Sequence, residues 1–431
     1  MSSAYWTQPI RDQTTVVRDG SISAESLVMQ VRGEIERREP DLAAWVELSS
    51  DYLDDARARG AATPDLPLRG VSLGVKDLID VAGLPTRAGS PVTSERPAMR
   101  DAACVARFRD LGAVVQGKTV TTEFGYFSPG PTHNPHASGY TPGGSSSGSA
   151  AAVGAGTIPV ALGTQTAGSL TRPASYCGAA GLVFAHGTTD LTGVTGLSDS
   201  LDTLGILTRT IDDLRYVYGA FTGERPVGST DGCVETILLW DGSTLDHIQP
   251  AMLRLLDLLP ELLQQAGFTP EKLEWDDHIR TLADDHLTVM AYEAARTLGP
   301  VLDQSGHLLS GQLRALLEDG RAVGTGMYAS ALIRRDRSRA LFSEMLTGNT
   351  VVIGPAALGA APQGLHATGS PILSRPWQLL GAPVVVVPGA RTNAGLPLGL
   401  QLMALPGHET RLFEVATLLE PMLRALPALP A

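Results

Sequence analysis

The apolar and polar positions near the start of the chain predict two helices. Residues 21–40 form the first, which a serine opens and Pro40 closes, because serine caps a helix start and proline does not continue a helix. Residues 41–60 form the second, which ends at Gly60. We therefore expect the chain to begin with helical structure.

A different pattern follows, in which short apolar runs alternate with helical spacing. Residues 71–80, VSLGVKDLID, predict a strand. Residues 102–112, AACVARFRDLG, predict a helix that stops at Gly112, and residues 113–117, AVVQG, predict the next strand. Further along, a loop enters a helix near Asp212. Strands and helices thus alternate through the first half of the chain.

The second half is richer in helices and ends in strands. Apolar stripes at helical spacing run through residues 250–348, and they predict amphipathic helices that face a core. The tail returns to strand patterns in TVVIGP, APVVVVPGA and GLPLGLQLMA, and closes with a helix over residues 408–423. Strands mixed with helices at both ends predict an α/β fold, with one large mixed β-sheet covered by helices on both faces.

The segment 140–181 breaks these patterns, because glycine, serine and alanine dominate it. Small side chains let backbone N–H groups approach a ligand closely, and they allow unusual backbone conformations. A flexible glycine–serine linker has a similar composition, but the apolar stretch IPVALG in the middle of this segment is typical of a strand. We therefore expect a system of active-site loops wrapped around a buried core.

Composition limits the classes to which this protein can belong. The formal net charge of −12, without a cluster of Lys and Arg, argues against direct binding of nucleic acid. Three cysteines (Cys104, Cys177 and Cys233) are few and odd in number, which disfavours a disulfide framework and favours a reducing compartment. The N-terminus lacks the apolar core of a signal peptide, and no stretch has the ~18 apolar residues of a membrane span. The sequence predicts a cytoplasmic protein without a membrane partner.

Three short motifs match known sites by letter but not by context. Residues 112–119 fit the phosphate-loop pattern G-x-x-x-x-G-K-[ST], yet the variable residues form the expected strand and cannot also cradle a phosphate. Residues 144–148 fit the G-x-S-x-G nucleophile elbow, which needs a strand before it, whereas the preceding residues are typical of a loop. His133 and His136 flank Pro135 in the same loop, so we do not expect them to bind a metal. We expect no metal and no cofactor.

Lys76, near the middle of VSLGVKDLID, is the first residue with candidate chemistry. Such a lysine can extend its amine to the surface. If it is buried instead, the loss of hydration disfavours its charged form and lowers its pKa. Moving that pKa from about 10.4 towards 7–8 requires roughly 4 kcal/mol of differential environment. A neutral buried lysine is a base that needs no histidine.

Ser169 follows a tight turn of small residues, Thr166, Ala167 and Gly168. The N–H groups of such a turn can converge on an oxyanion. Together with Lys76, this pattern predicts a serine hydrolase with a lysine base. The residues alone do not say which of the clustered serines is the nucleophile.

Four motifs carry a resemblance to a known family: GVKDLID, GGSSSGSAAAVGAG, GTQTAGSLTRPASYCGAAGL and SLDTLGILTRT. The chain resembles the amidase signature family, from ERREPDLAAWVELS near its N-terminus to GAPVVVVPG and GLPLGLQL near its C-terminus. The resemblance implies the amidase signature fold in a single domain over residues 1–431. Within it we expect a signature core over about 68–215, the helix-rich segment over about 250–348, and C-terminal strands with a helix over 349–431.

The resemblance also implies a Ser–cis-Ser–Lys triad. Lys76 matches the lysine of the family, Ser145 the bridging serine that follows a cis peptide bond, and Ser169 the nucleophile. In the implied mechanism Ser145 passes protons between Lys76 and Ser169 while an acyl-enzyme forms and is hydrolysed. The oxyanion is then held by the N–H groups of four residues, Thr166, Ala167, Gly168 and Ser169.

Arg172, three residues after the predicted nucleophile, is the candidate substrate-binding residue. It can form a salt bridge or bond loop carbonyls, or it can clamp a substrate carboxylate. The motifs are most similar to those of malonamidase, in which the matching arginine binds the acid group of a malonamate-type substrate. The chain departs from the common family pattern at Gln165, at Ala167 and in GLVFAHG over residues 181–187.

These features predict an amidase that cleaves the C–N bond of a small amide, with a carboxylate-bearing amide as the candidate substrate. Two other functions stay open. One is the A-type subunit of a tRNA-dependent amidotransferase of the same family, which works with partner chains. The other is a non-catalytic binding protein on the same fold. The sequence does not give the oligomeric state, and a homodimer is one arrangement that it leaves open.

Overall fold

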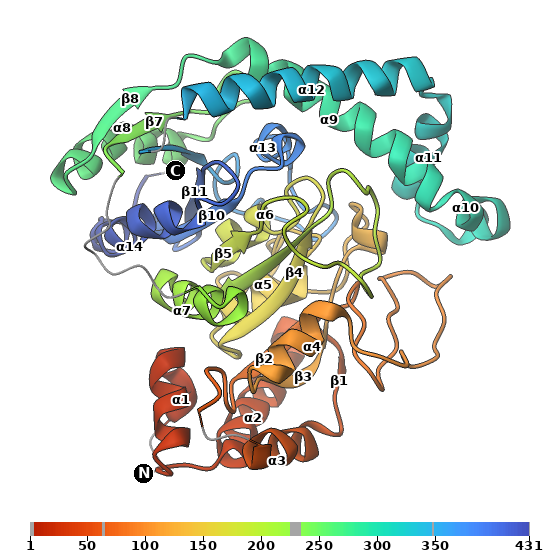
Figure 1. Cartoon of the computed structure of the whole chain (residues 1–431), viewed down its shortest axis with the longest axis vertical. Coiled ribbons are helices and arrows are strands. Elements are labelled where there is room, and N and C mark those ends of the chain that lie inside the picture. Colours follow the sequence, from red (N-terminus) through yellow and green to blue (C-terminus); the bar gives the residue numbers. More distant parts are fainter. Residues whose placement is uncertain (1–3, 63–64, 225–233, 347–348, 431) are drawn as a thin grey trace.

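The computed structural model describes residues 4–62, 65–224, 234–346 and 349–430, and its centre is a single β-sheet. Figure 1 shows the sheet in the middle of the molecule, with helices packed around it. Cys233 and the end of the helix-rich segment, residues 347–348, lie outside the described residues.

The sheet has eleven strands in the described part of the chain. In spatial order they are β1 (Trp45–Leu48), β3 (Val114–Thr119), β2 (Ser72–Lys76), β4 (Val160–Gln165), β6 (Thr203–Thr208), β5 (Ala180–Val183), β10 (Val384–Arg391), β11 (Pro397–Met403), β9 (Thr350–Pro355), β7 (Thr236–Leu239) and β8 (Thr269–Lys272). Strands β3, β2 and β4 run parallel, as do β9, β7 and β8, and the other neighbours are antiparallel. The predicted α/β fold with one large mixed sheet is confirmed.

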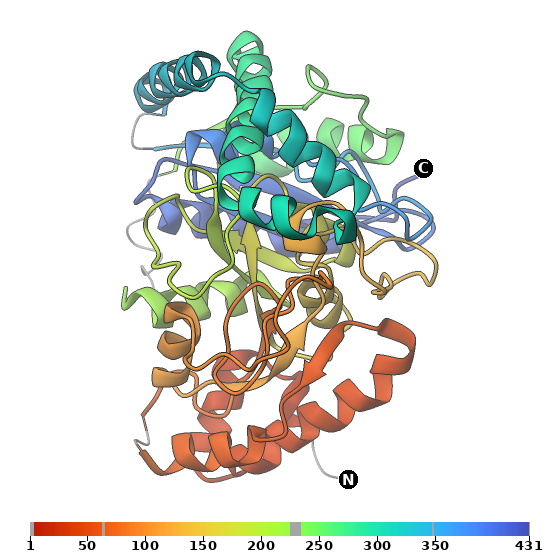
Figure 2. The same ribbon diagram turned by 90° about the vertical axis from the view of Figure 1, so that its right-hand side faces the viewer.

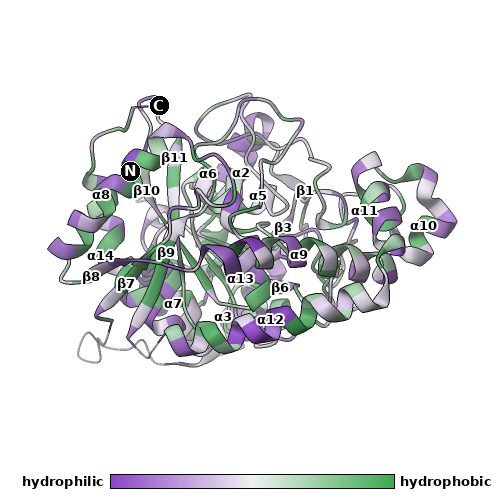
Figure 3. Cartoon of the chain, turned by 90° about the horizontal axis from the view of Figure 1, so that it is seen from above, coloured by the Kyte–Doolittle hydropathy of each residue, from purple (hydrophilic) through white to green (hydrophobic). Residues whose placement is uncertain are grey.

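Glycines in the central strands let helices approach the sheet closely. A Cβ on Gly163, Gly181 or Gly205 would lie 3.0 Å or less from the side chain of Leu170. Leu170 is fully buried and directly precedes α6 (Thr171–Cys177), which packs beside α5 (Ser147–Gly154). The helices α7 (Ile211–Thr222) and α14 (Glu409–Ala425) also contact central strands. Figure 3 shows the interior strands as mostly hydrophobic and the outer helices as mixed.

The N-terminal region differs from the two predicted helices. The predicted helix end at Pro40 is wrong by two residues, since a proline in the last helical turn removes only one backbone hydrogen bond. Residues 45–48 form a strand, because they pair with β3 in an antiparallel ladder that overrides their local helical signal. The described helices of this region are α1 (Ile10–Arg18), α2 (Ala24–Leu42) and α3 (Tyr52–Ala62), after a 3-10 turn over Tyr5–Thr7.

The next segments follow the prediction more closely. The two strands β2 and β3 form, with α4 (Ala103–Asp110) between them. Lys118, which would be the lysine of a phosphate loop, is buried in β3 and pairs with Asp77 at 2.8 Å. The residues 114–119 therefore form a strand and not a phosphate-binding loop. The segment 140–181 is more regular than the expected loop system, since it contains α5, β4 and α6.

The helix-rich segment lies across one side of the sheet. Its helices in the described residues are α8 (Pro250–Gln265), α9 (Asp276–Thr297), α10 (Gly299–Ser305), α11 (Gly311–Ala322) and α12 (Thr325–Met345), with a 3-10 turn over Gly306–Leu308. Figures 1 and 2 show α9 to α12 as an outer layer at one end of the molecule. The short helix α13 (Arg375–Leu380) packs against α9.

The predicted core-facing stripes hold for α8 but not for the whole of α12. Leu255, Leu259 and Leu263 of α8 are buried. In α12, by contrast, Met327 is 60% exposed and Ile333 is 69% exposed. The difference arises because α12 belongs to the outer layer and contacts mainly α9 and α13.

The described residues also bear on the expectations about disulfides and membrane spans. Cys104 and Cys177 are both buried free thiols. No helix within these ranges combines the length and the apolar character that crossing a membrane requires.

Candidate active site

Lys76 and Ser145 meet in the interior of the molecule. Lys76 ends β2 and is fully buried, and its Nζ donates to the Oγ of Ser145 at 2.7 Å. The same Nζ donates to the Oγ1 of Thr164 at 2.7 Å. Strands β2 and β4 are adjacent and parallel, so the ends that carry Lys76 and Thr164 lie at the same edge of the sheet. The alternative in which the lysine reaches the surface is therefore wrong.

Burial controls the charge of Lys76. Loss of hydration lowers the pKa of Lys76 from its usual value of 10.5 to about 7, and the carboxylate of Asp202 opposes this shift only in part. Near neutral pH, a large share of the Lys76 amines is therefore neutral. This is the protonation state that a general base needs.

Ser145 is held by an unusual stretch of backbone. The peptide bond between Gly144 and Ser145 is cis, as the family resemblance implies. Gly143 has a φ of 81°, and a Cβ at this position would lie 2.8 Å from the Cα of Pro173. A Cβ on Gly144 would lie 2.8 Å from the side chain of Thr368. The two glycines are thus required by the close packing around Ser145.

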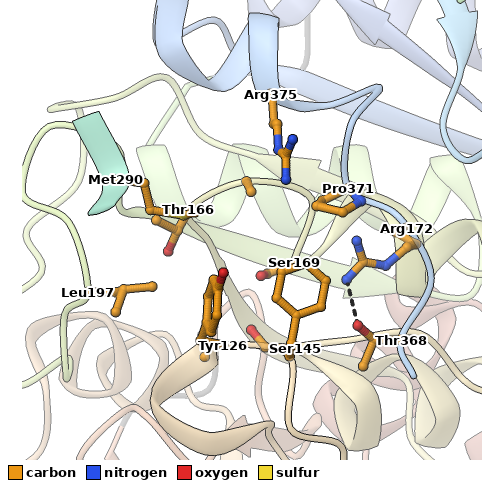
Figure 4. Close-up of a pocket in the computed structure, with 13 residues that line it drawn as sticks. Tyr126, Ser145, Thr166, Ser169, Arg172, Leu197, Met290, Thr368, Pro371 and Arg375 are labelled. Carbon is orange, nitrogen blue, oxygen red and sulfur yellow. Dashed lines mark hydrogen bonds between the residues drawn. The ribbon is translucent and has the colours of Figure 1, made fainter. Parts of the chain in front are cut away.

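Ser169 lies in the turn between β4 and α6, and it lines the same cavity as Ser145 (Figure 4). Its carbonyl accepts a hydrogen bond from the N–H of Ser146 at 3.0 Å, which ties the turn to the start of α5. No hydrogen bond between described atoms joins the hydroxyls of Ser145 and Ser169. The fold nevertheless brings both serines to one wall of the cavity, with Lys76 behind Ser145.

The backbone N–H groups of the turn 166–169, which lies beside the cavity, differ from those of the residues that follow. Gln165 anchors the residues that follow, since its Oε1 accepts from the N–H groups of Leu170 and Thr171 at 2.9 and 3.0 Å. The N–H groups of residues 166–169, in contrast, donate to no acceptor among the described residues. Unpartnered donors in a fixed turn are suited to bind an oxyanion.

Two residues that sequence reasoning missed hold this turn from the outside. The Oγ1 of Thr166 donates to the Oδ1 of Asp202 at 2.5 Å. The carbonyl of Thr166 accepts a hydrogen bond from the Nε2 of His286, a fully buried residue of α9, at 2.8 Å. Burial lowers the pKa of His286 to about 3, so its ring is neutral near pH 7. No sequence pattern connects His286 to a turn 120 residues earlier.

A cavity lies in front of the two serines. Two arginines, Arg172 and Arg375, are the charged members of its described lining. Arg172 is buried, and its Nη2 donates to the carbonyl of Gly144 at 2.6 Å and to the Oγ1 of Thr368 at 3.1 Å. Its Nε and Nη1 have no hydrogen-bond partner among the described residues. Arg172 thus bonds a loop carbonyl while two of its nitrogens stay without a partner. Arg375 was not predicted.

The remaining motifs do not form sites. Residues 144–148 follow a loop instead of a strand, so they do not form a nucleophile elbow. The Nε2 of His136 lies 2.8 Å from the carbonyl oxygen of Cys177. Across the part of the chain that the structure describes, no three side chains of His, Cys, Asp or Glu converge as metal ligands would.

Comparison with known proteins supplies the context for this geometry. The family described as Amidase matches residues 27–413. The A-type subunit of glutamyl-tRNA(Gln) amidotransferase from Anaeromyxobacter sp. (strain K) is 30% identical, over 98% of this chain and 97% of its own length. AtzE, the 1-carboxybiuret hydrolase subunit of Pseudomonas sp. (strain ADP), is 31% identical, over 84% of this chain and 85% of its own length. A crystal structure of an amidase is similar with a TM-score of 0.85 and 26% identity, over 96% of this chain and 100% of that chain.

Proposed function

The chain belongs to the amidase family and is an amide-hydrolysing enzyme, and we propose that Ser169 is its nucleophile, Ser145 its bridging hydroxyl and Lys76 its base. The observation that carries this proposal is the contact of 2.7 Å between the buried amine of Lys76 and the hydroxyl of Ser145. The unpartnered N–H groups of the turn 166–169 support it, because they supply a place for an oxyanion next to Ser169.

In the first step the Oγ of Ser169 bonds to the carbonyl carbon of the amide. Its proton passes to Ser145, whose own proton passes to neutral Lys76, so that no charge is left on a serine. The carbonyl oxygen becomes an oxyanion, which the N–H groups of residues 166–169 stabilise. No hydrogen bond among the described residues joins the hydroxyls of Ser145 and Ser169, and the proposal requires this link to form when substrate binds, as catalytic hydrogen bonds often do.

The C–N bond then breaks as the nitrogen receives the proton that Lys76 stored. The product amine leaves, and Ser169 remains as an ester of the acyl group. Water attacks this ester through the same relay, with Lys76 again accepting a proton, and releases the acid. Because Lys76 has a pKa of about 7, it can accept and return protons near neutral pH.

The unpartnered donors of Arg172 favour a substrate that carries a carboxylate. Its Nε and Nη1 are buried donors without partners, and buried donors of this kind normally have an acceptor. A carboxylate of a small amide, such as a malonamate-type substrate, would supply one through charge-assisted hydrogen bonds. The relatives named above do not single out malonamidase, so this substrate class remains a proposal.

A second candidate function is that of one component in a larger assembly. Both curated relatives named above are called subunits, one of an amidotransferase that is named for glutamyl-tRNA(Gln) and one of a hydrolase. The proposed chemistry at Ser169 would be the same in that case, but the chain would hydrolyse its amide only together with a partner chain.

One experiment tests the main proposal and separates it from the second. The chain is purified alone and given a panel of small amides, half of which carry a free carboxylate, while released ammonia is measured. Turnover without partners supports the independent amidase and contradicts an obligate assembly. If the chain releases ammonia only after a cellular partner is added, the second function is supported instead.

A further inference from the structure

Arg375 stands in the cavity without an anionic partner. It begins α13 and enters the cavity from the C-terminal part of the chain, above Ser169 in the view of Figure 4. Its Nε is buried and has no hydrogen-bond partner among the described residues. The side chain is partly buried, so it does not have the full hydration that a surface arginine has.

The surroundings of Arg375 offer little compensation for its charge. Burial lowers the pKa of Arg375, and Tyr126 and Asp284 oppose this shift only in part. Asp284 is exposed on α9 and is not part of the cavity lining, where Tyr126 is a neutral phenol near pH 7. Arg172 lines the same cavity, and the positive charge of Arg375 helps to lower the pKa of Arg172. Two guanidinium groups therefore share a partly dehydrated space in which the described lining carries no negative charge.

Such an arrangement is electrostatically unfavourable when the cavity holds no anion. Like charges repel more strongly at low dielectric constant, and each buried charge also loses hydration. An anionic ligand offsets these costs through charge-assisted hydrogen bonds, for which the guanidinium group is well suited. Arg172 has an unpartnered Nε and Nη1, and Arg375 has an unpartnered Nε, so each guanidinium group has a donor for a carboxylate of its own.

We propose that Arg375 is a second anion-binding residue, and that the enzyme acts on the amide of a small acid that carries two carboxylates, one for each arginine. The inference rests on the proposed function, because it assigns the substrate class of the same site.

The test measures binding in a protein that does not turn over. In the Ser169→Ala background, calorimetry compares three amides: tricarballylic acid monoamide with two carboxylates, glutaramate with one, and butyramide with none. We expect the dianion to bind at least about tenfold more tightly than glutaramate, which in turn binds more tightly than butyramide. Adding Arg375→Met should weaken binding of the dianion about 30-fold and that of glutaramate less than about threefold.

Two further variants control for effects of Arg375→Met that do not come from anion binding at the cavity. Arg254→Met removes the same charge from an exposed site on α8 outside the cavity, and it should change none of the three affinities. If Arg375→Met does not fold, Arg375→Lys keeps the charge but loses the planar fork, and it should weaken binding of the dianion alone.

The dianion proposal is overturned by equal losses for the dianion and glutaramate, or by no preference for the dianion in the parent protein. Because the measurement does not need turnover, it is independent of the reaction. A chain that hydrolyses no amide would contradict the proposed function, whereas the binding series alone decides the role of Arg375.

Discussion

The cavity has two walls that differ in origin and in character. The inner wall comes from the glycine- and serine-rich segment, where Ser145 lies just before α5 and the turn 166–169, which includes Ser169, follows the central strand β4. The outer wall comes from α9 and the C-terminal part of the chain, and it adds larger side chains such as Met290 and Arg375 (Figure 4). The inner wall holds the groups that can make and break bonds, and the outer wall holds groups that can select a substrate.

This division predicts that variants of the two walls fail in different ways. A loss on the inner wall should affect every amide, because all substrates share the reacting carbonyl. A loss on the outer wall should depend on what else the substrate carries. Arg172 and His286 test the boundary, since Arg172 belongs to the inner segment but is proposed to bind the substrate, and His286 belongs to α9 but bonds the carbonyl of Thr166.

The largest effect is expected at Ser169. Ser169→Ala removes the oxygen that forms the acyl-enzyme, so kcat should fall at least about 10⁴-fold for neutral and acidic amides alike. The measurement is ammonia release with each amide, together with mass spectrometry of an acyl-enzyme on the parent protein. Residual turnover near the parent rate would contradict the assignment of Ser169 as the nucleophile. An acyl group found on another serine would identify that serine as the nucleophile instead.

Lys76 should give the next largest loss, with a signature in pH. Lys76→Met removes the base, and kcat should fall about 10³-fold because the relay then has no acceptor for the proton. In the parent protein, activity should rise as pH increases through about 7, where Lys76 loses its charge. A Lys76→Met enzyme with near-normal activity at pH 8 would contradict the relay.

The same residue makes a prediction about stability. The pKa of Lys76 is lower in the folded protein than its usual value of 10.5, so unfolding takes up a proton between about pH 7 and that value. Stability of the parent should therefore rise with pH in this window, by about 2 kcal/mol between pH 7 and 9 from this residue alone. Lys76→Met should lack that part of the slope in thermal unfolding measured across pH. An identical slope in both proteins would show that Lys76 is not the dehydrated amine described here.

The two walls were not equally visible in the sequence. The residues of the inner wall could be predicted from local sequence patterns. The glycines, the serines and the turn before Ser169 lie within one segment, and Lys76 lies in an apolar run that predicts a strand. Two N-terminal predictions were wrong: α2 continues two residues past Pro40, and residues 45–48, predicted as part of a helix, form a strand because they pair with the distant β3.

The outer wall depends on contacts between distant parts of the chain. Arg375 begins a short helix, and nothing near it in the sequence points to a cavity formed with Arg172. His286 lies in a helix whose apolar pattern indicates only burial. A single sequence does not show which buried polar residue contacts which loop, so residues of this kind could be recognised only in the folded chain.

Arg172 should give a smaller and selective loss. Arg172→Met keeps much of the buried volume but removes the donors, so kcat/KM should fall about 100-fold for amides with a carboxylate and less than about tenfold for neutral amides. The neutral amides still report some loss, because the Nη2 of Arg172 also bonds the carbonyl of Gly144 next to Ser145. Equal losses on both kinds of amide would show that Arg172 supports the loop and does not bind a carboxylate.

The smallest effect, expected at His286, tests whether the outer wall reaches into the chemistry. The Nε2–H of His286 donates to the carbonyl of Thr166, and this contact helps to fix the direction of the neighbouring N–H groups. His286→Leu leaves that buried carbonyl without its donor, which costs about 1–3 kcal/mol of stability and loosens the turn. We expect kcat to fall about tenfold with KM little changed, because the turn acts mainly on the oxyanion of the transition state.

A matched variant separates positioning from simple packing. His286→Gln can place an amide N–H near the position of Nε2, and it should restore kcat to within about threefold of the parent. The activity–pH profile should keep its shape in both variants, since the lowered pKa of His286, about 3, keeps the ring neutral across the working range. If the Leu and Gln variants lose the same activity, His286 is only a core residue. If Gln alone recovers kcat, the hydrogen bond from His286 of the helix-rich layer holds the turn 166–169 in the position that catalysis requires.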